Sequence, residues 1–422
     1  MQYFYPTDTL VTAPEIIFFW VARMIMAGLE FRNEIPFKHV YFTSIIRDGQ
    51  GRKMSKSLGN SPDPLDVIAT YGADALRFTV LFVAPMGQDV QYENEKCEMG
   101  RNFANKIWNA GRFLLMHRDQ LTIHNEQLPI IGSQVPKGWI PTSEDLSDTW
   151  ILSRFNSTVK DVTDALENFR VNEAVKMVYE FLWKDFCDWY IEFVKNRLQE
   201  TSDAHLKTSI VNRALAMYGE TLKLLHPFMP FVTEELWQGI AERGEKESIM
   251  VSAWPQTDES LIDKQAEQAM EFLQDVIGSI RNIRNEMNIA PTKSVDLVVN
   301  CNNFDKLSVL ESNKLSLQRL TRLNEMTLGI AVPKPGYCAS AVVQGQEIFI
   351  PLKGLIDLDV ERTRLQKEIE RLEGQLRGVA AKLDSENFVS KAPADVLEKE
   401  RAKRDNFSST IEKLKVSLSQ LQ

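Results

Sequence analysis

The sequence predicts a mostly α-helical protein with two short α/β parts, and three observations carry this prediction. Apolar residues recur at intervals of three and four across most of residues 146–290, as they do on the buried faces of amphipathic helices. The last 68 residues, 355–422, repeat apolar side chains in heptads. Val40–Ile46 is a continuous β-branched and aromatic run, which suits a strand buried on both faces of a parallel sheet.

Composition bounds the number of domains and the kind of partner. A chain of 422 residues predicts two to four domains, and 44% apolar residues are enough to form real cores. The net charge is −9, which argues against a protein coated in positive charge. Any binding of nucleic acid must therefore use local basic patches.

The cysteines argue against a disulfide-linked or metal-binding protein, and the longest apolar run argues against a membrane protein. Cys97, Cys187, Cys301 and Cys338 lie far apart and form no C-x-x-C pair, which predicts reduced, mostly buried thiols in a cytoplasmic protein without a structural metal. The run Ile16–Leu29 contains Arg23 and is shorter than the roughly 18–20 residues of a membrane span. It is therefore predicted to be a buried helix of a large domain, with no membrane partner.

Residues 1–62 have an α/β pattern. A helical stretch, Glu15–Leu29, precedes the strand-like run Val40–Ile46, and the polar segment RKMSKSLGN (52–60) follows. One helix and one strand cannot complete a sheet domain. These residues are therefore predicted to be the remnant of a larger domain.

The middle of the chain is predicted to be helical. Helical spacing runs from Asp63 to about Arg118, and the proline-containing stretch 119–145 is predicted to be a linker, so that 63–145 form one part. Residues 146–290 are predicted to form a helical bundle, broken at HPFMPF (226–231) and at VSAWP (251–255). Trp150, Trp189 and Trp237 are assigned to core packing.

Two smaller parts complete the chain. Residues 291–354 contain three strand-like stretches, VDLVV, MTLGIAV and QEIFIPL, with a helical piece over Phe304–Leu320, which predicts a small α/β module. Two heptad helices flank a turn at SENFVSKAPA in 355–422, which predicts an antiparallel coiled-coil hairpin. This hairpin has 13 acidic and 13 basic side chains and is therefore neutral overall.

The polar segment 52–60 has two interpretations. Lys53 and Lys56 lie three residues apart on a loop flanked by glycines, and two ammonium groups so placed can close on a chain of phosphates. A K-x-x-K pair is more often part of a solvated basic loop. The pair alone does not decide between these interpretations.

The residues around this loop resemble a known family. KMSKS after a predicted buried strand, followed by GNSPDPLDVIATYGADALRF, is similar to the signature loop of class I aminoacyl-tRNA synthetases. The strings RNFANKIWNAGRF, LSDTWILSR, DWYIEFVKNRL, LLHPFMPFVTEELW and IRNIRNEM resemble the valyl and isoleucyl branch and cover the chain nearly end to end. YFYPTDTLVT, EIIFFWVARMI and the hairpin turn NFVSKAP resemble the valyl family.

The resemblance implies an architecture and an activity. It identifies 1–62 with the C-terminal half of a Rossmann-like catalytic domain, 63–145 with stem-contact helices and a linker, 146–290 with the anticodon-binding bundle and 355–422 with a tRNA-binding arm. The family's HIGH-type motif and its editing domain do not occur in this sequence. We therefore expect the chain alone to be inactive in the ligation of valine to its tRNA.

The resemblance also implies roles in ATP and valine binding. Four loop residues are implied to be catalytic, namely Lys53, Ser55, Lys56 and Ser57. Lys53 and Lys56 would bind ATP, which enters with Mg²⁺, and Glu15 falls where the family usually has an Asp that faces the ribose. Ile16 and Trp20, four residues apart, would form part of the valine pocket, although such a pair is more commonly plain core.

Partners follow from the same resemblance: tRNA(Val), valine and ATP, bound by a monomer. RNA loops are read by bases that stack on aromatic rings and on Arg planes. Residues implied to contact tRNA are Phe113, which matches a family position at the anticodon, together with Arg101, Arg112, Lys195 and Arg197. Arg281 and Arg284 are either phosphate contacts or ordinary surface residues.

Two alternatives remain open on the sequence. An isoleucyl-tRNA synthetase fragment would lack the terminal hairpin and often has a zinc module with cysteine pairs. A non-catalytic tRNA-binding or coiled-coil scaffold protein would keep KMSKS only as a vestige. A HIGH motif upstream of Met1 would dismiss the scaffold alternative.

Overall fold

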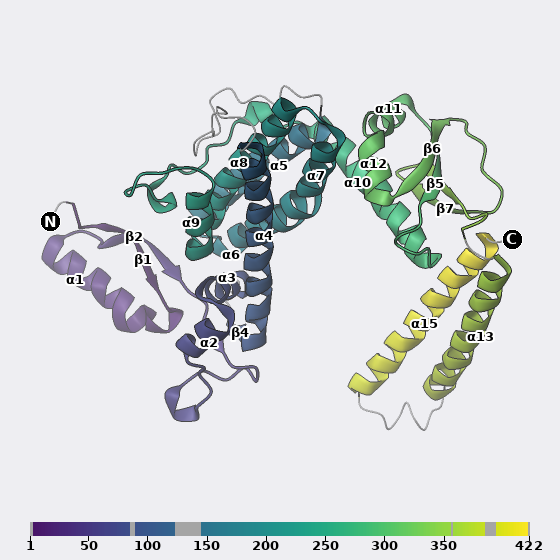
Figure 1. Cartoon of the computed structure of the whole chain (residues 1–422). Coiled ribbons are helices and arrows are strands. Elements are labelled where there is room, and N and C mark those ends of the chain that lie inside the picture. The colour runs from purple at the N-terminus through teal and green to yellow at the C-terminus, as the bar shows by residue number, and fades with distance from the viewer. Residues whose placement is uncertain (1–2, 85–88, 123–144, 356–357, 385–393, 421–422) are drawn as a thin grey trace. The chain divides into compact units, whose positions relative to one another are not determined.

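The computed structural model describes residues 3–84, 89–122, 145–355, 358–384 and 394–420, and α-helix dominates them, as the sequence predicts (Figure 1). The chain divides into two compact units, Met1–Glu267 and Gln268–Gln422. Each unit is described by itself. The five-part division at residues 62, 145, 290 and 354 stays a prediction.

The first unit begins with a two-stranded parallel sheet. β1 (Thr7–Thr12) pairs with β2 (Phe37–Phe42), with Thr7 opposite Phe37 and Thr12 opposite Phe42. Between the strands lie a 3-10 turn (Pro14–Ile16), a π-helical segment (Ile17–Val21) and α1 (Ala22–Arg32). The predicted strand Val40–Ile46 is confirmed as a parallel strand only up to Phe42, because residues 43–45 are not strand and Ile46 begins a separate one. β1 is a strand that the pattern did not indicate.

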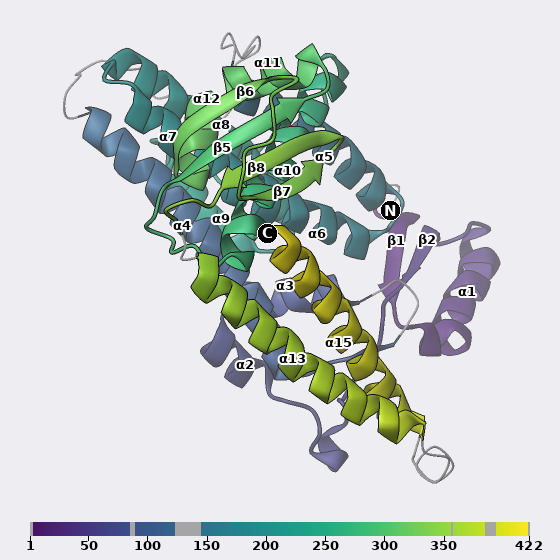
Figure 2. The same ribbon diagram turned by 90° about the vertical axis from the view of Figure 1, so that its right-hand side faces the viewer.

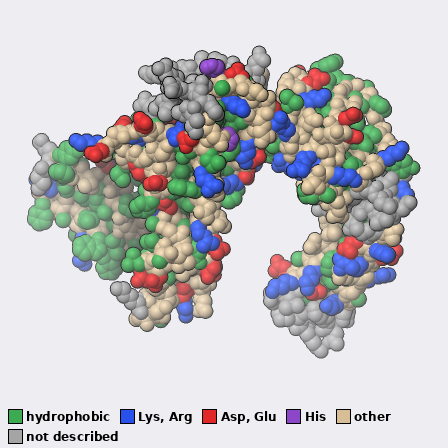
Figure 3. Space-filling model, in the orientation of Figure 1, with side chains coloured by type: hydrophobic (Ala, Val, Ile, Leu, Met, Phe, Trp, Pro, Cys, Tyr) green, Lys and Arg blue, Asp and Glu red, His purple; other side chains and the backbone are tan. Residues whose placement is uncertain are grey.

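The prediction that this segment is buried is wrong. Phe18 is 82% exposed, Trp20 60% and Phe31 81%, and the space-filling view shows apolar side chains gathered over this part of the chain (Figure 3). Within β2, Phe37 alone is buried. The physical reason is that, among the described residues, no further strand or helix covers these surfaces.

A small core supports the polar loop. β3 (Ile46–Arg47) and β4 (Val90–Gln91) pair in parallel, and the helices α2 (Pro64–Tyr71) and α3 (Ala73–Val83) follow the loop in sequence. Val67, Tyr92 and Cys97 form the buried centre, and Met54 of the loop packs against it. The Asp63 carboxylate caps α2 by accepting a hydrogen bond from the Leu65 amide at 2.9 Å.

The helical bundle predicted for residues 146–290 is confirmed. Its elements are α4 (Cys97–Thr122), α5 (Leu146–Glu167), α6 (Val171–Glu180), a π-helical segment (Phe181–Tyr190), α7 (Ile191–Glu200), α8 (Ala204–Leu225) and α9 (Pro230–Gly239). The long helix α4, from the part predicted to precede the bundle, packs against α8 and α9. The predicted linker 119–145 overlaps α4 at its start, and most of it lies outside the described residues. The break at HPFMPF is real, because Pro230 begins α9.

The bundle is held by close packing. A side chain at Gly111 of α4 would meet Leu236 at 2.8 Å and Tyr218 at 2.9 Å, so a residue without Cβ lets these helices approach. Trp150 and Trp237 are each 3% exposed and belong to the core, as predicted, whereas Trp189 is only half-buried. Burial raises the pKa of the Cys187 thiol to about 12, which fits an inert structural cysteine.

The second unit contains the small α/β module (Figure 2). Its sheet has the order β6-β5-β8-β7, with β5 parallel to β6 and antiparallel to β8. The elements are α10 (Lys264–Glu286, shared with the first unit), β5 (Val295–Cys301), α11 (Phe304–Ser312), α12 (Lys314–Thr321), β6 (Leu323–Ile330), β7 (Cys338–Val343) and β8 (Gln346–Pro351). The prediction missed β7 and the break between the two helices.

The C-terminal hairpin is confirmed. α13 (Leu358–Leu383) and α15 (Ala394–Gln420) pack along each other through the heptad residues Ile369, Leu372 and Ile411 (Figure 2). The turn at 385–393 lies outside the described residues. Over the described part of the chain, no helix is both long enough and apolar enough to cross a lipid bilayer.

Candidate functional site

The polar loop begins with a tight hairpin. Lys53 forms an antiparallel bridge to Arg47, and the Asp48 amide donates to the Arg52 carbonyl at 3.0 Å. Gly51 turns the chain at φ +77°, in the left-handed region that favours glycine. The first half of the loop is therefore a hydrogen-bonded turn and not irregular coil.

Lys53 and Glu15 meet. The Lys53 ammonium lies 2.7 Å from the Glu15 carboxylate, and the two side chains are 60% and 48% exposed. Two of the residues implied to bind ATP are therefore neighbours in space, although they lie 38 residues apart in sequence. An exposed pair of this kind stabilises a fold by about 0–1 kcal/mol, so an anionic ligand can compete for the ammonium at little cost.

The two serines of the loop lie at its tip. The Ser55 and Ser57 hydroxyls are 3.2 Å apart, and the Leu58 amide donates to Ser55 Oγ at 3.3 Å. The backbone of Lys56 opens a 3-10 turn (Lys56–Leu58), whereas its side chain lies outside what the structure describes. The hydroxyls therefore order the backbone of the tip and remain open to solvent on the exposed Ser57 side.

Ile16 and Trp20 are not successive turns of one α-helix, as their spacing suggested. Ile16 ends the 3-10 turn and Trp20 belongs to the π-helical segment that follows. Ile16 is half-buried and Trp20 is 60% exposed, so the alternative that both are plain core residues is wrong. The indole is available to line a pocket, and its role in binding valine stays a prediction.

Phe113 lies on α4 in a polar and aromatic setting. Its ring centroid is 4.3 Å from that of His117, and the Lys195 ammonium lies 5.4 Å from the ring. Lys195 also pairs with Glu192 at 2.5 Å, and Arg112, one residue earlier on α4, is exposed. A half-buried ring beside a cation is the kind of surface on which an unstacked base can rest.

His117 was missed by the sequence-based interpretation. Its Nδ1 lies 2.9 Å from the Phe113 carbonyl oxygen. Because a carbonyl only accepts, Nδ1 carries the proton, and Nε2 of the neutral ring is then a hydrogen-bond acceptor. The signal was the i, i+4 spacing of two aromatic rings on a predicted helix.

Arg197 is placed differently from the tRNA contact that the resemblance implied. It is 9% exposed, and its guanidinium lies 2.9 Å from the buried carboxylate of Asp148, to which Arg213 and the Tyr190 hydroxyl also bond. Burial would raise the pKa of Asp148, but the two guanidinium groups outweigh it and the pKa is lowered. The Asp148 carboxylate of α5 therefore holds Arg197 of α7 and Arg213 of α8 together, and the buried Arg197 side chain contributes to the packing of these helices.

The remaining basic candidates differ in exposure: Arg101 and Arg281 reach the surface, whereas Arg284 is buried. Arg101 is half-exposed, lies 3.5 Å from Glu98 and sits 5.6 Å from the Tyr71 ring. Arg281 is exposed, as both of its interpretations required, and donates to the Leu320 carbonyl. Arg284 is 7% exposed and donates to the carbonyls of Thr321, Ala290 and Lys293, so both interpretations made for it were wrong.

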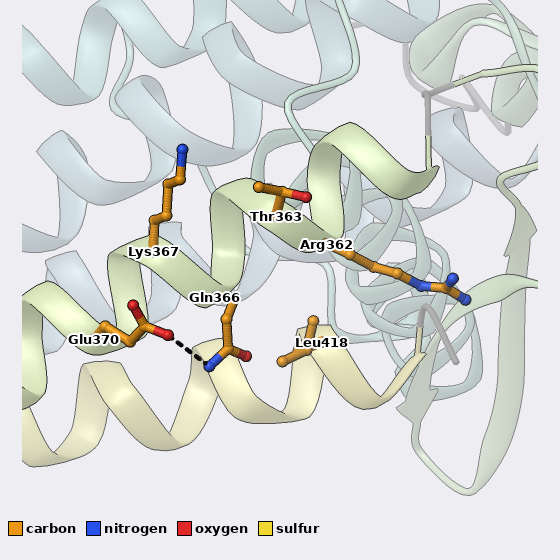
Figure 4. Close-up of a pocket in the computed structure, with 6 residues that line it drawn as sticks. All are labelled: Arg362, Thr363, Gln366, Lys367, Glu370 and Leu418. Atoms are coloured by element: carbon orange, nitrogen blue, oxygen red, sulfur yellow. Dashed lines mark hydrogen bonds between the residues drawn. The ribbon is translucent and has the colours of Figure 1, made fainter.

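The hairpin arm offers a polar groove. A hollow of about 670 Å³ is lined by Arg362, Thr363, Gln366, Lys367, Glu370 and Leu418 (Figure 4). Gln366 donates to Glu370 at 3.2 Å, and the Lys367 side chain points away from Leu418. Ion pairs also join the two helices, such as Lys415 with Glu373 at 2.7 Å, so that many of the arm's charges are neutralised locally.

Models of known protein families match three successive parts of the chain. The family model of class I tRNA synthetases (I, L, M and V) matches residues 1–93, that of the anticodon-binding domain of tRNA ligases matches 148–299, and that of the valyl tRNA synthetase tRNA binding arm matches 357–422. Three parts of the chain are therefore similar to parts of class I tRNA synthetases.

Individual relatives indicate which kind of tRNA synthetase the chain resembles. A valine–tRNA ligase of Chlorobaculum tepidum is 44% identical over 423 residues, which cover 100% of this chain and 46% of the relative. One of Fusobacterium nucleatum is 43% identical over 425 residues, with the same coverage. A ternary LeuRS–tRNA–LeuAMS complex from Agrobacterium radiobacter aligns with a TM-score of 0.46 at 21% identity, over 78% of this chain and 38% of that one.

Over its whole length the chain is similar to valine–tRNA ligases, and it spans about half the length of the curated relatives it matches. The isoleucyl alternative is not favoured, because these relatives are valine–tRNA ligases and the arm model is a valyl one. The scaffold alternative is not favoured either.

Proposed function

We propose that this chain is the part of a valine–tRNA ligase that supplies the ATP loop and the tRNA-binding surfaces. The whole enzyme would join the carboxylate of valine to the α-phosphate of ATP with loss of pyrophosphate. It would then pass the valyl group to a hydroxyl at the end of tRNA(Val) with loss of AMP. The observation that carries the proposal is similarity to valine–tRNA ligases over the whole of this chain, together with a loop that brings Lys53 to Glu15.

The ATP loop would act by electrostatics. Negative charge grows on the pyrophosphate as it leaves, so an ammonium group that approaches late stabilises the transition state more than the ground state. Lys56 is the proposed group for this step, with Lys53 as a second phosphate contact once it leaves Glu15. Ser55 and Ser57 would bond phosphate oxygens, Glu15 would accept from the ribose hydroxyls, and Mg²⁺ would arrive bound to ATP as part of the substrate.

The aromatic surface on α4 would read RNA. Phe113 and His117 are proposed to stack an unpaired base of the tRNA, while the exposed Arg112 and the half-exposed Lys195 hold neighbouring phosphates. Arg101 is proposed as a further phosphate contact and Arg197 as a residue that positions α7. Ile16 and Trp20 are proposed to wall the valine side chain, in a monomeric enzyme of the cytoplasm.

RNA binding is tested with the purified chain. A tRNA(Val) transcript should bind saturably, and Phe113→Ala should weaken binding about 10-fold, since stacking contributes about 1–3 kcal/mol per base. Leu115→Ala, a change on the same helix away from the Phe113 ring, is the matched control and should alter affinity less than 2-fold. Equal affinity for an unrelated tRNA would contradict the proposal.

Catalysis is tested in the longer polypeptide that contains this chain. Lys56→Ala should lower valine-dependent ATP–pyrophosphate exchange by about 10²-fold, the size expected when a preorganised electrostatic contact is lost. The 422-residue chain by itself should show no exchange above background, because it contains no HIGH motif. Exchange by the purified chain would show that the missing motif is not required.

A further inference from the structure

The base and the tip of the polar loop are held differently. The Asp48 side chain is almost fully buried and accepts hydrogen bonds from the amides of Gln50 at 3.0 Å and Arg52 at 2.8 Å. The Arg52 guanidinium also bonds this carboxylate, at 2.8 Å from Nε. These donors stabilise the charged carboxylate and hold the pKa of Asp48 well below its usual range, Asn60 contributing most.

Asn60 closes the loop from its far end. Its amide nitrogen donates to Asp48 Oδ2 at 2.9 Å and to the Lys53 carbonyl at 3.2 Å, while its Oδ1 accepts from the Ser55 amide at 2.9 Å. One side chain therefore bonds three points of the loop, of which Asp48 lies 12 residues away from Asn60 in sequence. Gly59, at φ +61°, turns the chain so that Asn60 can face back toward Lys53.

The tip has no comparable support. Leu58 is 63% exposed, and a Cβ built on Gly59 would meet nothing within 4 Å. In the described part of the chain, the side-chain hydrogen bonds of the tip are local: the Ser57 hydroxyl lies 3.2 Å from that of Ser55, and the Leu58 amide donates to Ser55 Oγ. The loop thus consists of a base tied by side-chain bonds and a tip, 56–59, that stands in solvent.

We propose that Asp48 and Asn60 are positioning residues that clamp the base of the loop, so that the backbone at Lys53 stays in place and only the tip carrying Lys56 moves when a polyphosphate binds. The two lysines would then have different roles, one as a fixed contact and one as a mobile contact. The polyphosphate part of this statement rests on the proposed function; the clamp itself rests on the hydrogen bonds.

The clamp is tested on the whole chain by trypsin cleavage and amide hydrogen exchange. Asp48→Asn and Asn60→Ala should each raise cleavage after Lys53, and exchange of the Ser55 amide, about 10-fold, because each loses bonds worth about 1–2 kcal/mol. Cleavage after Lys56 should change less than 2-fold, since the tip is already open. Gln50→Ala, whose exposed side chain takes no part in the clamp, is the matched control.

A swap separates the clamp from a general loss of stability. In the double variant Asp48→Asn with Asn60→Asp, an amide again faces a carboxylate, so cleavage after Lys53 should fall at least 3-fold below that of Asp48→Asn. A swap that stays as open as the single variants, or single variants that cleave at the rate of the original chain, would overturn the clamp. A lowered melting temperature with equal increases at both lysines would also overturn it.

The link to polyphosphate is tested with inorganic tripolyphosphate. It should slow cleavage after Lys56, and hydrogen exchange of the Ser57 amide, at least 3-fold in the original chain. Exchange of the Ser55 amide should stay unchanged, because Lys53 would bind without movement of its backbone. Slower exchange of the Ser55 amide as well would overturn the division of roles. If tripolyphosphate protects neither lysine while the swap still restores resistance, the proposed ATP role of the loop fails and the clamp stands.

Discussion

The N-terminal α/β segment and the helical bundle use similar residues to opposite effect. Trp20 in the segment is 60% exposed, whereas Trp150 in the bundle is 3% exposed. Phe18 and Phe31 are more than four-fifths exposed, while Phe186 of the bundle is fully buried. Apolar composition alone therefore does not tell whether a residue contributes to stability; what matters is whether another element covers it.

The N-terminal segment and the bundle also differ in their ionic contacts. Glu15 and Lys53 face each other in solvent, where they contribute little and stay available to a ligand. Asp148 and Arg197 form a buried contact in which every charge is compensated. The first arrangement is suited to exchange of partners, and the second to a fixed relation between helices.

The largest effect should come from the bundle core. Trp150→Ala should lower the free energy of unfolding by about 3–5 kcal/mol, because it leaves a cavity among close-packed helices. Urea unfolding followed by far-ultraviolet circular dichroism measures it. A loss below about 1 kcal/mol would mean that the bundle repacks around the cavity and that Trp150, although buried, contributes little more to stability than the exposed Trp20.

Removing the buried carboxylate should have an effect almost as large. Asp148→Ala leaves Arg213 buried without its anion and leaves Arg197 with Asp145 alone, at 3.0 Å, and should cost about 3–5 kcal/mol at pH 7. Asp161→Ala changes an exposed acid of the same helix and should stay within about 0.5 kcal/mol. Similar losses from the two changes would contradict the structural role given to Asp148.

The pH dependence of that contact has a definite sign. The folded pKa of Asp148 is lowered, so its contribution is fully present above the unfolded value of about 3.9 and is lost as pH falls through the folded pKa. The difference in melting temperature between the original chain and Asp148→Ala should therefore be constant from pH 8 to 5 and shrink only below about pH 4. A difference that shrinks between pH 8 and 6 would point to another group.

The C-terminal hairpin differs from both regions, because its two helices cover each other's apolar faces. Ending the chain at Gly354 should leave the melting of the bundle unchanged within about 1 °C, because the buried heptad residues contact each other within the hairpin. Affinity for tRNA(Val) should fall about 10-fold, with a shallow salt dependence, since the arm is neutral. A dimer that becomes monomeric on truncation, with RNA affinity unchanged, would show that the arm pairs chains instead.

The smallest effect should be at the exposed face itself. Trp20→Gln should change the free energy of unfolding by less than about 0.5 kcal/mol, since little area is buried there. The fluorescence of a bound hydrophobic dye should decrease. A large loss of stability would mean that the segment is better covered in solution than its exposed fractions indicate.

By itself, the sequence determined the helical bundle, the heptad hairpin and the polar loop, because these depend on short-range periodicity and on spacing within a few residues. It could not determine which apolar runs are covered, since Ile16–Leu29 has the pattern of a buried helix and lies largely in solvent. It indicated Arg197 and Arg284 as surface cations, yet tertiary packing placed both inside. Asp48 meets Asn60, and Glu15 meets Lys53, only because the folded backbone brings distant residues within hydrogen-bond distance, and no local pattern encodes that approach.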